Sequence, residues 1–365
     1  MSVILFYSPF DQRSRDTESL MIAFKRQGHR VISLSQASGA QIHDHLAQHG
    51  IETYTHVISG ARNWWYYFRH TRFLISFIKK HKVQIVYSHL EPANIVAAVA
   101  QYFTKAKVYL VRHHIDEARL QGFDRSWTYR LTYKLAKNII VVSEKAKDFM
   151  TDVEKIDPLK IIHINLAYDF SIYNKPDLAK VKQIKAGFED CVTLLTVCRF
   201  TQHKRADVAI QTVRLLRDRG IRARLILLGR GEEIGKITAI IHGENLGDVV
   251  VLPGYVSNVL DYMAASNFLV HPSVLESSCV TVKEAALVRL PVIVCKGVGD
   301  FDDYIENGKD GFVLDPGKFA AGAADIIAQH KDSDMAAMTE SLHKKVLELF
   351  NVEKLVDKYQ KLNEA

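Results

Sequence analysis

Short apolar runs alternate with longer segments of mixed polarity along the whole chain. The runs are rich in β-branched and aliphatic side chains, which is typical of strands buried in a parallel sheet. In the first half they predict strands at Val3–Tyr7, Arg30–Leu34, Gln84–Tyr87, Lys107–Arg112 and Asn138–Val142. Helical spacing of the apolar residues between them predicts helices near 15–27, 62–81, 91–103, 124–136 and 144–151.

The second half repeats this alternation. It predicts strands at Val192–Val197, Ala223–Leu228, Val249–Leu252, Phe268–His271 and Val292–Cys295, and helices near 204–219, 257–265, 280–288 and 317–329. Alternating strands and helices form parallel sheets with helices on both faces, and ligands bind at the carboxyl ends of the strands. We therefore expect an α/β fold with two Rossmann-like domains facing across a cleft.

A polar stretch from Asn165 to Asp190 separates the two halves and predicts the crossover between domains. We expect an N-terminal domain over 1–170 and a C-terminal domain over 171–350. The pattern beyond about 333 is helical, and Asn351 is a plausible cap between the last two helices. The final segment, 351–365, is expected to form a helix that packs back on the N-terminal domain.

Composition indicates an ordinary globular enzyme or binding protein. Of the 365 residues, 48% are hydrophobic and 24% charged. No apolar run reaches the ~20 residues of a membrane-spanning helix, and the chain opens on a strand-like run instead of a signal peptide. The four cysteines lie apart in the second half. A reduced, cytoplasmic protein without a metal site is therefore expected.

Charge is distributed unevenly between the two halves. Residues 1–170 carry 23 Lys/Arg against 15 Asp/Glu, which gives this half a net charge of +8. The rest of the chain carries 25 against 26, a net charge of −1, so the whole chain has +7. A basic half joined to a nearly neutral one indicates a surface that meets an anionic partner. Nucleic acid, acidic lipid and a phosphorylated substrate all fit this charge pattern alone.

Two glutamates mark the first candidate site. Glu276 follows the strand that ends at His271, and Glu284 lies eight residues later on an apolar helix that begins near Val280. The loop places the backbone N–H groups of Ser278, Cys279 and Val280 at a helix N-terminus, where an anion or a sugar hydroxyl can be held. Either glutamate alone also fits a structural interpretation, as a capping residue or as a solvated helix residue.

Cations mark the second candidate site. Arg199 and Lys204 lie in the polar loop between a strand and the helix that follows it. Arginine offers a bidentate fork and lysine a point charge, and both suit a diphosphate. A basic helix start without a ligand is the alternative. The glycine turn that begins at Gly229 has the spacing G-x-G-x-x-x-G, which is a weak dinucleotide motif.

These motifs together resemble the family-4 retaining glycosyltransferases of GT-B fold. The resemblance rests on the Glu-x7-Glu pair, on the run Tyr262-Met-Ala-Ala-Ser-Asn-Phe-Leu-Val-His-Pro-Ser before it, and on Leu290-Pro-Val-Ile-Val-Cys after it. It implies that Arg199 and Lys204 hold the donor diphosphate and that Glu284 binds the ribose hydroxyls. It also implies that Glu276 and the amides of Ser278, Cys279 and Val280 bind the donor sugar, with Gly229 and Tyr255 lining the donor site.

The first domain supplies further candidates by the same resemblance. The family ends one strand in a T-x-H pattern whose histidine meets the donor sugar, and His114 matches it better than His113. The expected catalytic residues are therefore His114 and Glu276. The family's first loop carries paired glycines, whereas this chain has Arg13, Ser14 and Arg15, so a side-chain charge would replace amide contacts with a phosphate or acceptor. Cys198 and Arg205 likewise replace glycines of the diphosphate loop.

Aromatic and basic residues are concentrated in 62–82. At helical spacing the aromatic side chains exceed what one buried stripe requires, and cations flank them. Tyrosine and tryptophan beside lysine and arginine suit an anionic membrane surface. A buried helix with solvated basic ends is the equal alternative, and nothing else in the chain supports nucleic acid.

The function expected is transfer of a hexose-type sugar from a nucleotide-diphosphate sugar to a glycan or a polyprenyl-diphosphate-linked acceptor, in cell-surface polysaccharide assembly. No cofactor or metal is expected, because fixed cations and a helix N-terminus neutralise the leaving diphosphate. The protein is expected in the cytoplasm or at the inner face of the cell membrane. A sugar-nucleotide epimerase or phosphorylase of the same fold, or a non-catalytic sugar-nucleotide or lipid-binding protein, are the alternatives.

Overall fold

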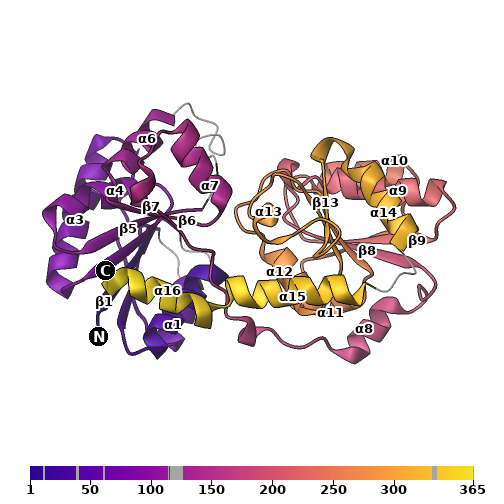
Figure 1. Cartoon of the computed structure of the whole chain (residues 1–365), viewed down its shortest axis with the longest axis horizontal. Coiled ribbons are helices and arrows are strands. Elements are labelled where there is room, and N and C mark those ends of the chain that lie inside the picture. The colour runs from indigo at the N-terminus through magenta and orange to yellow at the C-terminus, as the bar shows by residue number, and fades with distance from the viewer. Residues whose placement is uncertain are drawn as a thin grey trace. The chain divides into compact units, whose positions relative to one another are not determined.

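The computed structural model describes residues 1–10, 13–37, 41–60, 62–113, 115, 126–330 and 335–364. The chain divides into two compact units (Figure 1). The first contains Met1–Phe170 together with Leu349–Ala365, and the second contains Ser171–Glu348. Each unit is described by itself below.

The first unit is built on a seven-stranded parallel sheet in the order β3-β2-β1-β4-β5-β6-β7. Its strands are β1 (Val3–Ser8), β2 (Arg30–Ser35), β3 (Glu52–Thr55), β4 (Ile85–His89), β5 (Lys107–Arg112), β6 (Asn138–Val141) and β7 (Ile161–His163). β4 is buried along its whole length because helices cover both faces of the sheet. Continuous apolar runs therefore predicted these central strands well.

Helices cover the two faces of this sheet in separate groups (Figure 1). One group contains α3 (Trp64–His81), α4 (Ala93–Ala100), the 3-10 turn η1 (Gln101–Phe103) and α6 (Ser126–Leu135). The other contains α1 (Arg15–Arg26), α2 (Gln41–Gln48) and the C-terminal α16 (Val352–Glu364). The helix expected over 144–151 is α7 (Glu144–Asp148), which continues as a π-helical turn over Phe149–Val153.

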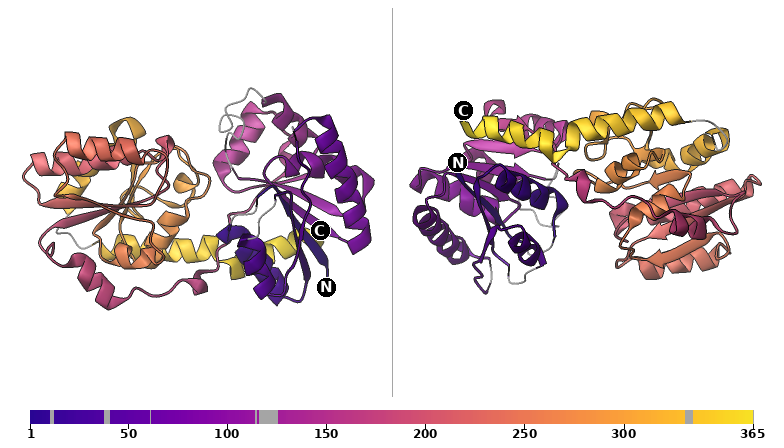
Figure 2. Two further views of the ribbon diagram at one scale, coloured as in Figure 1. Left: turned by 180° about the vertical axis from the view of Figure 1, so that it is seen from behind. Right: turned by 90° about the horizontal axis from the view of Figure 1, so that it is seen from below.

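The C-terminal helix is part of the first unit. The Tyr87 hydroxyl donates to Asn363 Oδ1 at 2.8 Å, and the Tyr109 hydroxyl donates to the carbonyl of Leu362 at 2.7 Å. Tyr359 packs edge-on against Phe24 and Tyr87. Both chain ends consequently lie on this unit, as the two views of Figure 2 show.

The second unit carries a six-stranded parallel sheet in the order β10-β9-β8-β11-β12-β13. Its strands are β8 (Val192–Val197), β9 (Ala223–Leu228), β10 (Val250–Gly254), β11 (Phe268–His271), β12 (Val292–Cys295) and β13 (Phe312–Leu314). Its main helices are α8 (Leu178–Lys185), α9 (Ala206–Asp218), α10 (Ile234–Gly243), α11 (Val259–Ala264), α12 (Val280–Leu287), α13 (Phe301–Tyr304), α14 (Phe319–His330) and α15 (Ala336–Phe350). The strand order reverses beside β8, and ligands of such sheets bind at this switch point.

Several elements were not predicted from the sequence. They are β3, β7 and β13 among the strands and α2, α8, α10 and α13 among the helices. The three strands have three or four residues each, too few for a period to be recognised. α8 has no buried residue, so it lacks the apolar stripe by which a helix is recognised.

Candidate active site

The first side of the site is the loop between β8 and α9. The turn η5 (Gln202–Lys204) presents Lys204, and Arg205 then adopts φ 52° and ψ 45°. This is the left-handed region that favours glycine, and Arg205 stands where the resembled family has glycine. The loop therefore keeps a glycine-like conformation without the residue. The Arg205 guanidinium pairs with the carboxylate of Asp207 at 3.1 Å.

The opposite side of the site is the loop between β11 and α12. Cys279 is the N-cap residue of α12 in extended conformation, and its side chain makes no capping hydrogen bond. The N–H groups of a helix's first turn have no partner within the helix, so they are available to an anion. The two loops follow the neighbouring strands β8 and β11, which places them at one edge of the sheet.

A charged cluster joins the two loops. Lys204 Nζ lies 2.5 Å from Glu276 Oε1, and His271 Nε2 lies 2.7 Å from the same oxygen. The Cys279 thiol lies 3.4 Å from His271 Nε2. The Glu276 side chain is 8% exposed and that of His271 is 2% exposed. One carboxylate oxygen therefore receives two cationic donors in a nearly dry environment.

The side chains of Glu276, His271 and Lys204 are all held in their charged forms. Burial alone would raise the pKa of Glu276, but the hydrogen bonds and charges of His271 and Lys204 outweigh burial and lower that pKa to about 2. Burial alone would lower the pKa of His271, but Cys279 and Glu276 raise it to about 10. Lys204 also has a raised pKa, because Glu276 outweighs the effect of burial. Near neutral pH the cluster is thus a carboxylate between an imidazolium and an ammonium.

Glu284 is buried, with 4% of its surface exposed. The interpretation of Glu284 as a solvated helix residue is therefore wrong. Its neighbour Lys283 is fully buried and pairs with the equally buried Asp300 at 2.9 Å. Asp300 Oδ2 also accepts from the Ser278 hydroxyl at 2.6 Å, so the pair anchors the loop that carries Ser278 to α12.

Glycines allow close approach of the loops. A Cβ on Gly229 would lie 1.8 Å from the carbonyl oxygen of Cys198, and φ there is +143°. A Cβ on Gly299, where φ is +57°, would lie 2.9 Å from the Cβ of Glu276. Gly229 therefore supports the loop that carries Arg199, and Gly299 supports the loop that carries Glu276.

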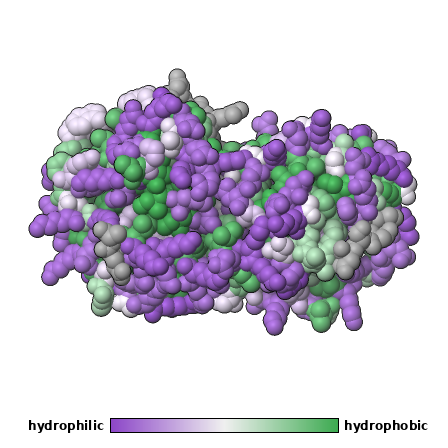
Figure 3. Space-filling model, in the orientation of Figure 1, coloured by the Kyte–Doolittle hydropathy of each residue, from purple (hydrophilic) through white to green (hydrophobic). Residues whose placement is uncertain are grey.

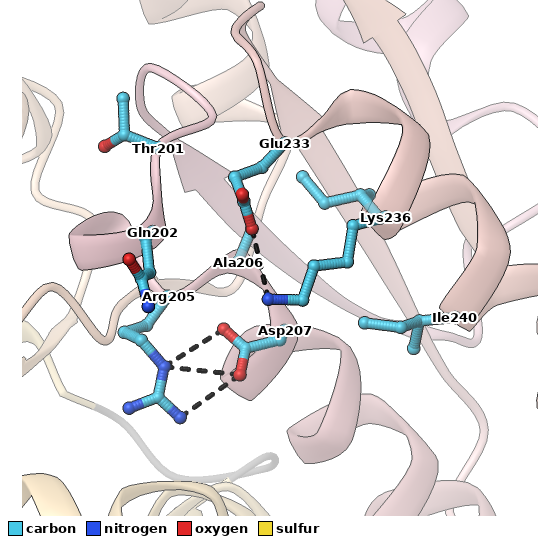
Figure 4. Close-up of a pocket in the computed structure, with 9 residues that line it drawn as sticks. Thr201, Gln202, Arg205, Ala206, Asp207, Glu233, Lys236 and Ile240 are labelled. Atoms are coloured by element: carbon cyan, nitrogen blue, oxygen red, sulfur yellow. Dashed lines mark hydrogen bonds and ion pairs between the residues drawn. The ribbon is translucent and has the colours of Figure 1, made fainter.

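Described residues of the second unit bound at least two cavities. One of about 280 Å³ is bounded by Thr201, Gln202 and Arg205 to Asp207 from the β8–α9 region and by residues of α10 with the preceding Glu233 (Figure 4). Its wall carries the Arg205–Asp207 pair and the pair of Lys236 with Glu233. The other, about 570 Å³, is bounded by α8, the end of β10 and α11 and includes Tyr255. Tyr255 is 73% exposed, and the Arg230 guanidinium lies 5.5 Å from its ring centre.

The first unit carries a histidine pair at the carboxyl edge of its sheet. His89 Nδ1 lies 2.9 Å from His113 Nε2. Burial first, and then the neighbouring His113, lower the pKa of His89 well below its usual value, so His89 is neutral at pH 7. His114 lies outside the described residues.

The first loop uses its arginine internally. The Arg13 guanidinium binds both oxygens of Glu18, the shortest contact being 2.7 Å. The amide of Ser14 donates to the same carboxylate at 2.9 Å. Glu18 is 3% exposed, so the charge of Arg13 is balanced by a buried partner. Arg15 opens α1 and has interactions of its own.

One group of side chains has the atoms and spacing to hold a metal ion among the described residues. His271, Glu276 and Cys279 place one ligand atom each within 4.8 Å of one another. However, a metal needs neutral imidazole, whereas His271 has a raised pKa, and Lys204 already occupies the Glu276 oxygen. These residues fit an anion-binding cluster better than a metal site.

Helix α3, which covers most of 62–82, has both buried and exposed aromatic side chains. Its side chains of Tyr66, His70, Leu74, Phe77 and Ile78 are buried. Trp64, Trp65 and Phe68 are exposed by 64%, 53% and 47%, and the two tryptophan rings stack at 3.8 Å. The helix is therefore a core element whose N-terminal end carries an exposed aromatic cluster. Within the described residues, no helix is both long and apolar enough to cross a bilayer.

Sequence reasoning named the two glutamates and the two cations but gave no role to His271, Lys283 or Asp300. His271 was visible as a histidine ending a buried strand five residues before a glutamate. Lys283 and Asp300 gave a weaker signal, a lysine within an otherwise apolar helical stretch and an aspartate in a glycine turn. Their pairing depends on contacts between segments 17 residues apart.

Two family models match consecutive parts of the chain. Glycosyltransferase Family 4 matches residues 15–171, and Glycosyl transferases group 1 matches residues 179–345. Together they cover both units apart from residues 1–14, 172–178 and 346–365.

Individual relatives and solved structures agree with these matches. The chain is 24% identical over 288 residues to N-acetyl-alpha-D-glucosaminyl L-malate synthase of Bacillus anthracis, covering 77% of this chain and 74% of the relative. It is 22% identical over 304 residues to UDP-Gal:alpha-D-GlcNAc-diphosphoundecaprenol alpha-1,3-galactosyltransferase of Escherichia coli, covering 79% and 77%. HepE of Anabaena, solved in complex with UDP, superposes with a TM-score of 0.84 at 17% identity over the full length of both chains. The GT-B fold predicted from the sequence is confirmed.

Proposed function

This chain belongs to the family-4 glycosyltransferases, and on that premise we propose that it moves a hexose-type sugar from a nucleotide-diphosphate sugar with retention of the anomeric configuration. The acceptor would be a glycan or a polyprenyl-diphosphate-linked sugar in cell-surface polysaccharide assembly. The observation that carries the proposal is the charged cluster of Lys204, Glu276 and His271 between the two loops at the carboxyl edge of the second sheet.

Different residues of the second unit would bind different parts of the donor. Arg199 and Lys204 would bind the diphosphate, and the amides from Ser278 to Val280 would add donors at the start of α12. Glu276 is ionised and held by two cations, so its second oxygen can accept a sugar hydroxyl at a fixed position. Glu284 would accept the ribose hydroxyls.

Charge at the leaving group would be stabilised by these fixed cations. Developing negative charge on the diphosphate is stabilised most by donors that need no rearrangement. We propose that Arg199, Lys204 and the helix N-terminus do this without a metal ion or other cofactor. Undiminished turnover in excess EDTA is the expected result, and loss of turnover restored by a divalent cation would contradict it.

Uridine diphosphate is the nucleotide we propose. HepE of Anabaena was solved with UDP and with UDP-glucose, and the Escherichia coli relative is named for a UDP-galactose donor. That relative is also named for a diphosphoundecaprenol acceptor. A lipid-linked acceptor would place this protein peripherally at the inner face of the membrane, where the exposed aromatic end of α3 and the cations of 62–82 suit an anionic surface.

Thermal shift with a panel of UDP- and GDP-sugars tests the donor site. A ligand that binds only the folded state raises the melting temperature by mass action. One UDP-sugar should raise it for the wild type and for Lys309→Ala, whose side chain is 62% exposed and remote in sequence from both loops. Lys204→Ala and Glu284→Ala should each abolish the shift relative to their own unliganded melting temperatures.

The remaining outcomes separate the alternatives. Donor consumption that needs no acceptor would indicate an epimerase or phosphorylase, and a thermal shift without turnover on any acceptor would indicate a non-catalytic binder. The anomeric configuration of the product, measured by NMR coupling constants, tests retention. An inverted product would overturn that part of the proposal.

A further inference from the structure

A contiguous apolar surface covers part of the first unit, outside the site described above. It is formed by Val99, Tyr102, Phe103, Trp127, Leu131 and Leu135, with exposed fractions from 37% to 65%, and is called the α4–α6 surface here. Trp127, Leu131 and Leu135 are spaced four residues apart, so they form one stripe along α6. The opposite side of the same helix, with Tyr129 and Tyr133, is buried in the core.

Hydrogen bonds hold the two parts of this surface side by side. The Tyr102 hydroxyl donates to the carbonyl of Leu135 at 2.7 Å, and the Gln101 side chain donates to the same carbonyl at 3.0 Å. The Lys137 ammonium lies 4.9 Å from the centre of the Tyr102 ring. Exposed apolar residues that are scattered singly are ordinary, but a contiguous group of this size indicates a partner. Figure 3 shows that the face of the molecule seen in Figure 1 mixes hydrophilic and hydrophobic residues.

Charge identifies the kind of partner. The segments 97–105 and 126–137 contain no Asp or Glu, while they contain Lys105, Arg130, Lys134 and Lys137. All four of these cations are exposed. Lysine is depleted in protein–protein interfaces, whereas aromatic and aliphatic side chains bordered by lysine and arginine suit the headgroup region of an anionic bilayer. The positive charge of these two segments therefore favours lipid over a second protein.

We infer that the α4–α6 surface docks on an anionic membrane, with its aromatic and aliphatic side chains among the headgroups and its four cations on lipid phosphates. This surface is separate from the exposed aromatic end of α3, which was the segment that the sequence singled out. The inference deepens the proposed function and rests on it for its purpose, because a membrane-bound enzyme can reach a lipid-linked acceptor. Binding to vesicles itself needs neither donor nor acceptor.

Vesicle co-sedimentation of the full chain tests the surface. The vesicles are phosphatidylcholine alone or mixed with phosphatidylglycerol. The wild type should bind the mixed vesicles and lose binding at high salt, because surface charges are screened. Removing two large inserted side chains in the double variant F103S/L131S should weaken partitioning at least about tenfold. The double variant K134Q/K137Q should weaken it by about twenty-five-fold, since each cation near the surface is worth about a factor of five.

Matched controls separate this surface from others. Leu178→Ser removes a leucine that is 76% exposed on α8 of the second unit and should leave binding unchanged. W64S/W65S removes the exposed end of α3. If F103S/L131S binds as the wild type does, or if only W64S/W65S loses binding, the inference is overturned. It is also overturned if the wild type ignores vesicles and forms a dimer that F103S/L131S dissociates.

The donor-site measurement keeps the two proposals distinguishable. F103S/L131S and K134Q/K137Q should retain the wild-type thermal shift with the UDP-sugar, because neither variant touches the second unit. Vesicle binding without any UDP-sugar shift would support the surface and contradict the proposed donor. A UDP-sugar shift without vesicle binding would do the reverse.

Discussion

His89 and His271 occupy equivalent places in the two units, but at neutral pH His89 is uncharged and His271 is a cation. Each ends the strand that pairs with the first strand of its unit, β4 beside β1 and β11 beside β8. Both side chains are buried, at 4% and 2% exposed. His89 is neutral and has a pKa well below the usual value, whereas the pKa of His271 is raised to about 10.

The difference lies in what each imidazole faces. His89 contacts another imidazole, that of His113, and burial then acts without opposition. His271 contacts Cys279 and the Glu276 carboxylate, which together outweigh the effect of burial and raise its pKa. The strand order therefore places a histidine at the carboxyl edge of each sheet. The side chains that contact this histidine determine whether it is a cation. In the second unit a charged cluster forms at that edge, which is the chemistry expected for a diphosphate ligand.

Removal of Glu276 should have the largest effect on this comparison. Glu276→Ala leaves the cations of His271 and Lys204 buried without their anion. Breaking such a pair typically lowers the free energy of unfolding by about 3 to 5 kcal/mol. Urea denaturation measures this loss.

The exposed pair of Lys309 and Glu306 provides the control for Glu276. Both of these side chains are more than 60% exposed. Glu306→Ala should leave the urea midpoint unchanged, because solvent already stabilises both charges. An equal loss for the two alanine variants would show that the Glu276 cluster is no more than a surface ion pair.

The pH dependence of stability should separate the two histidines. His271 has a raised folded pKa, so its contribution is complete below about pH 6.5 and is lost as pH rises toward about 10. His89 has a lowered folded pKa, so its contribution is complete above about pH 6.5 and is lost as pH falls. Each accounts for a slope of up to about 1.4 kcal/mol per pH unit.

Unfolding curves from acid to alkaline pH measure these slopes. His89→Gln should flatten the acid side of the stability profile, and His271→Gln should flatten the alkaline side. If both substitutions flatten the same side, the two histidines do not differ in charge as described here.

The smallest effect is expected at the neutral pair. His113→Ala removes the partner of His89 Nδ1 and leaves a buried neutral group unpaired, which costs about 1 to 2 kcal/mol. The pKa of His89 should also rise, since His113 contributes to lowering it. NMR titration of the His89 ring and urea denaturation measure the two effects. A loss as large as that of Glu276→Ala would contradict a neutral pair.

The sequence alone determined the arrangement of the fold. Continuous apolar runs identified the buried strands, because a strand covered on both faces needs no polar positions. Elements without such a pattern were missed, as in the exposed helix α8 and the three-residue strand β13. The motifs also placed Arg199, Lys204 and Glu276 in loops that follow strands and Glu284 within the next helix, where the structure has them.

Only the tertiary structure decided how these residues are used. The sequence does not indicate that Lys204 contacts Glu276, 72 residues away, or that Arg13 pairs with the buried Glu18. The sequence also did not decide whether Glu284 is buried or solvated. It predicted a helix near 124–136 but did not indicate that one side of this helix is apolar and exposed. Charge state, pairing and exposure depend on which side chains from other segments lie within a few ångströms. These contacts cannot be read from the spacing of residues along the chain.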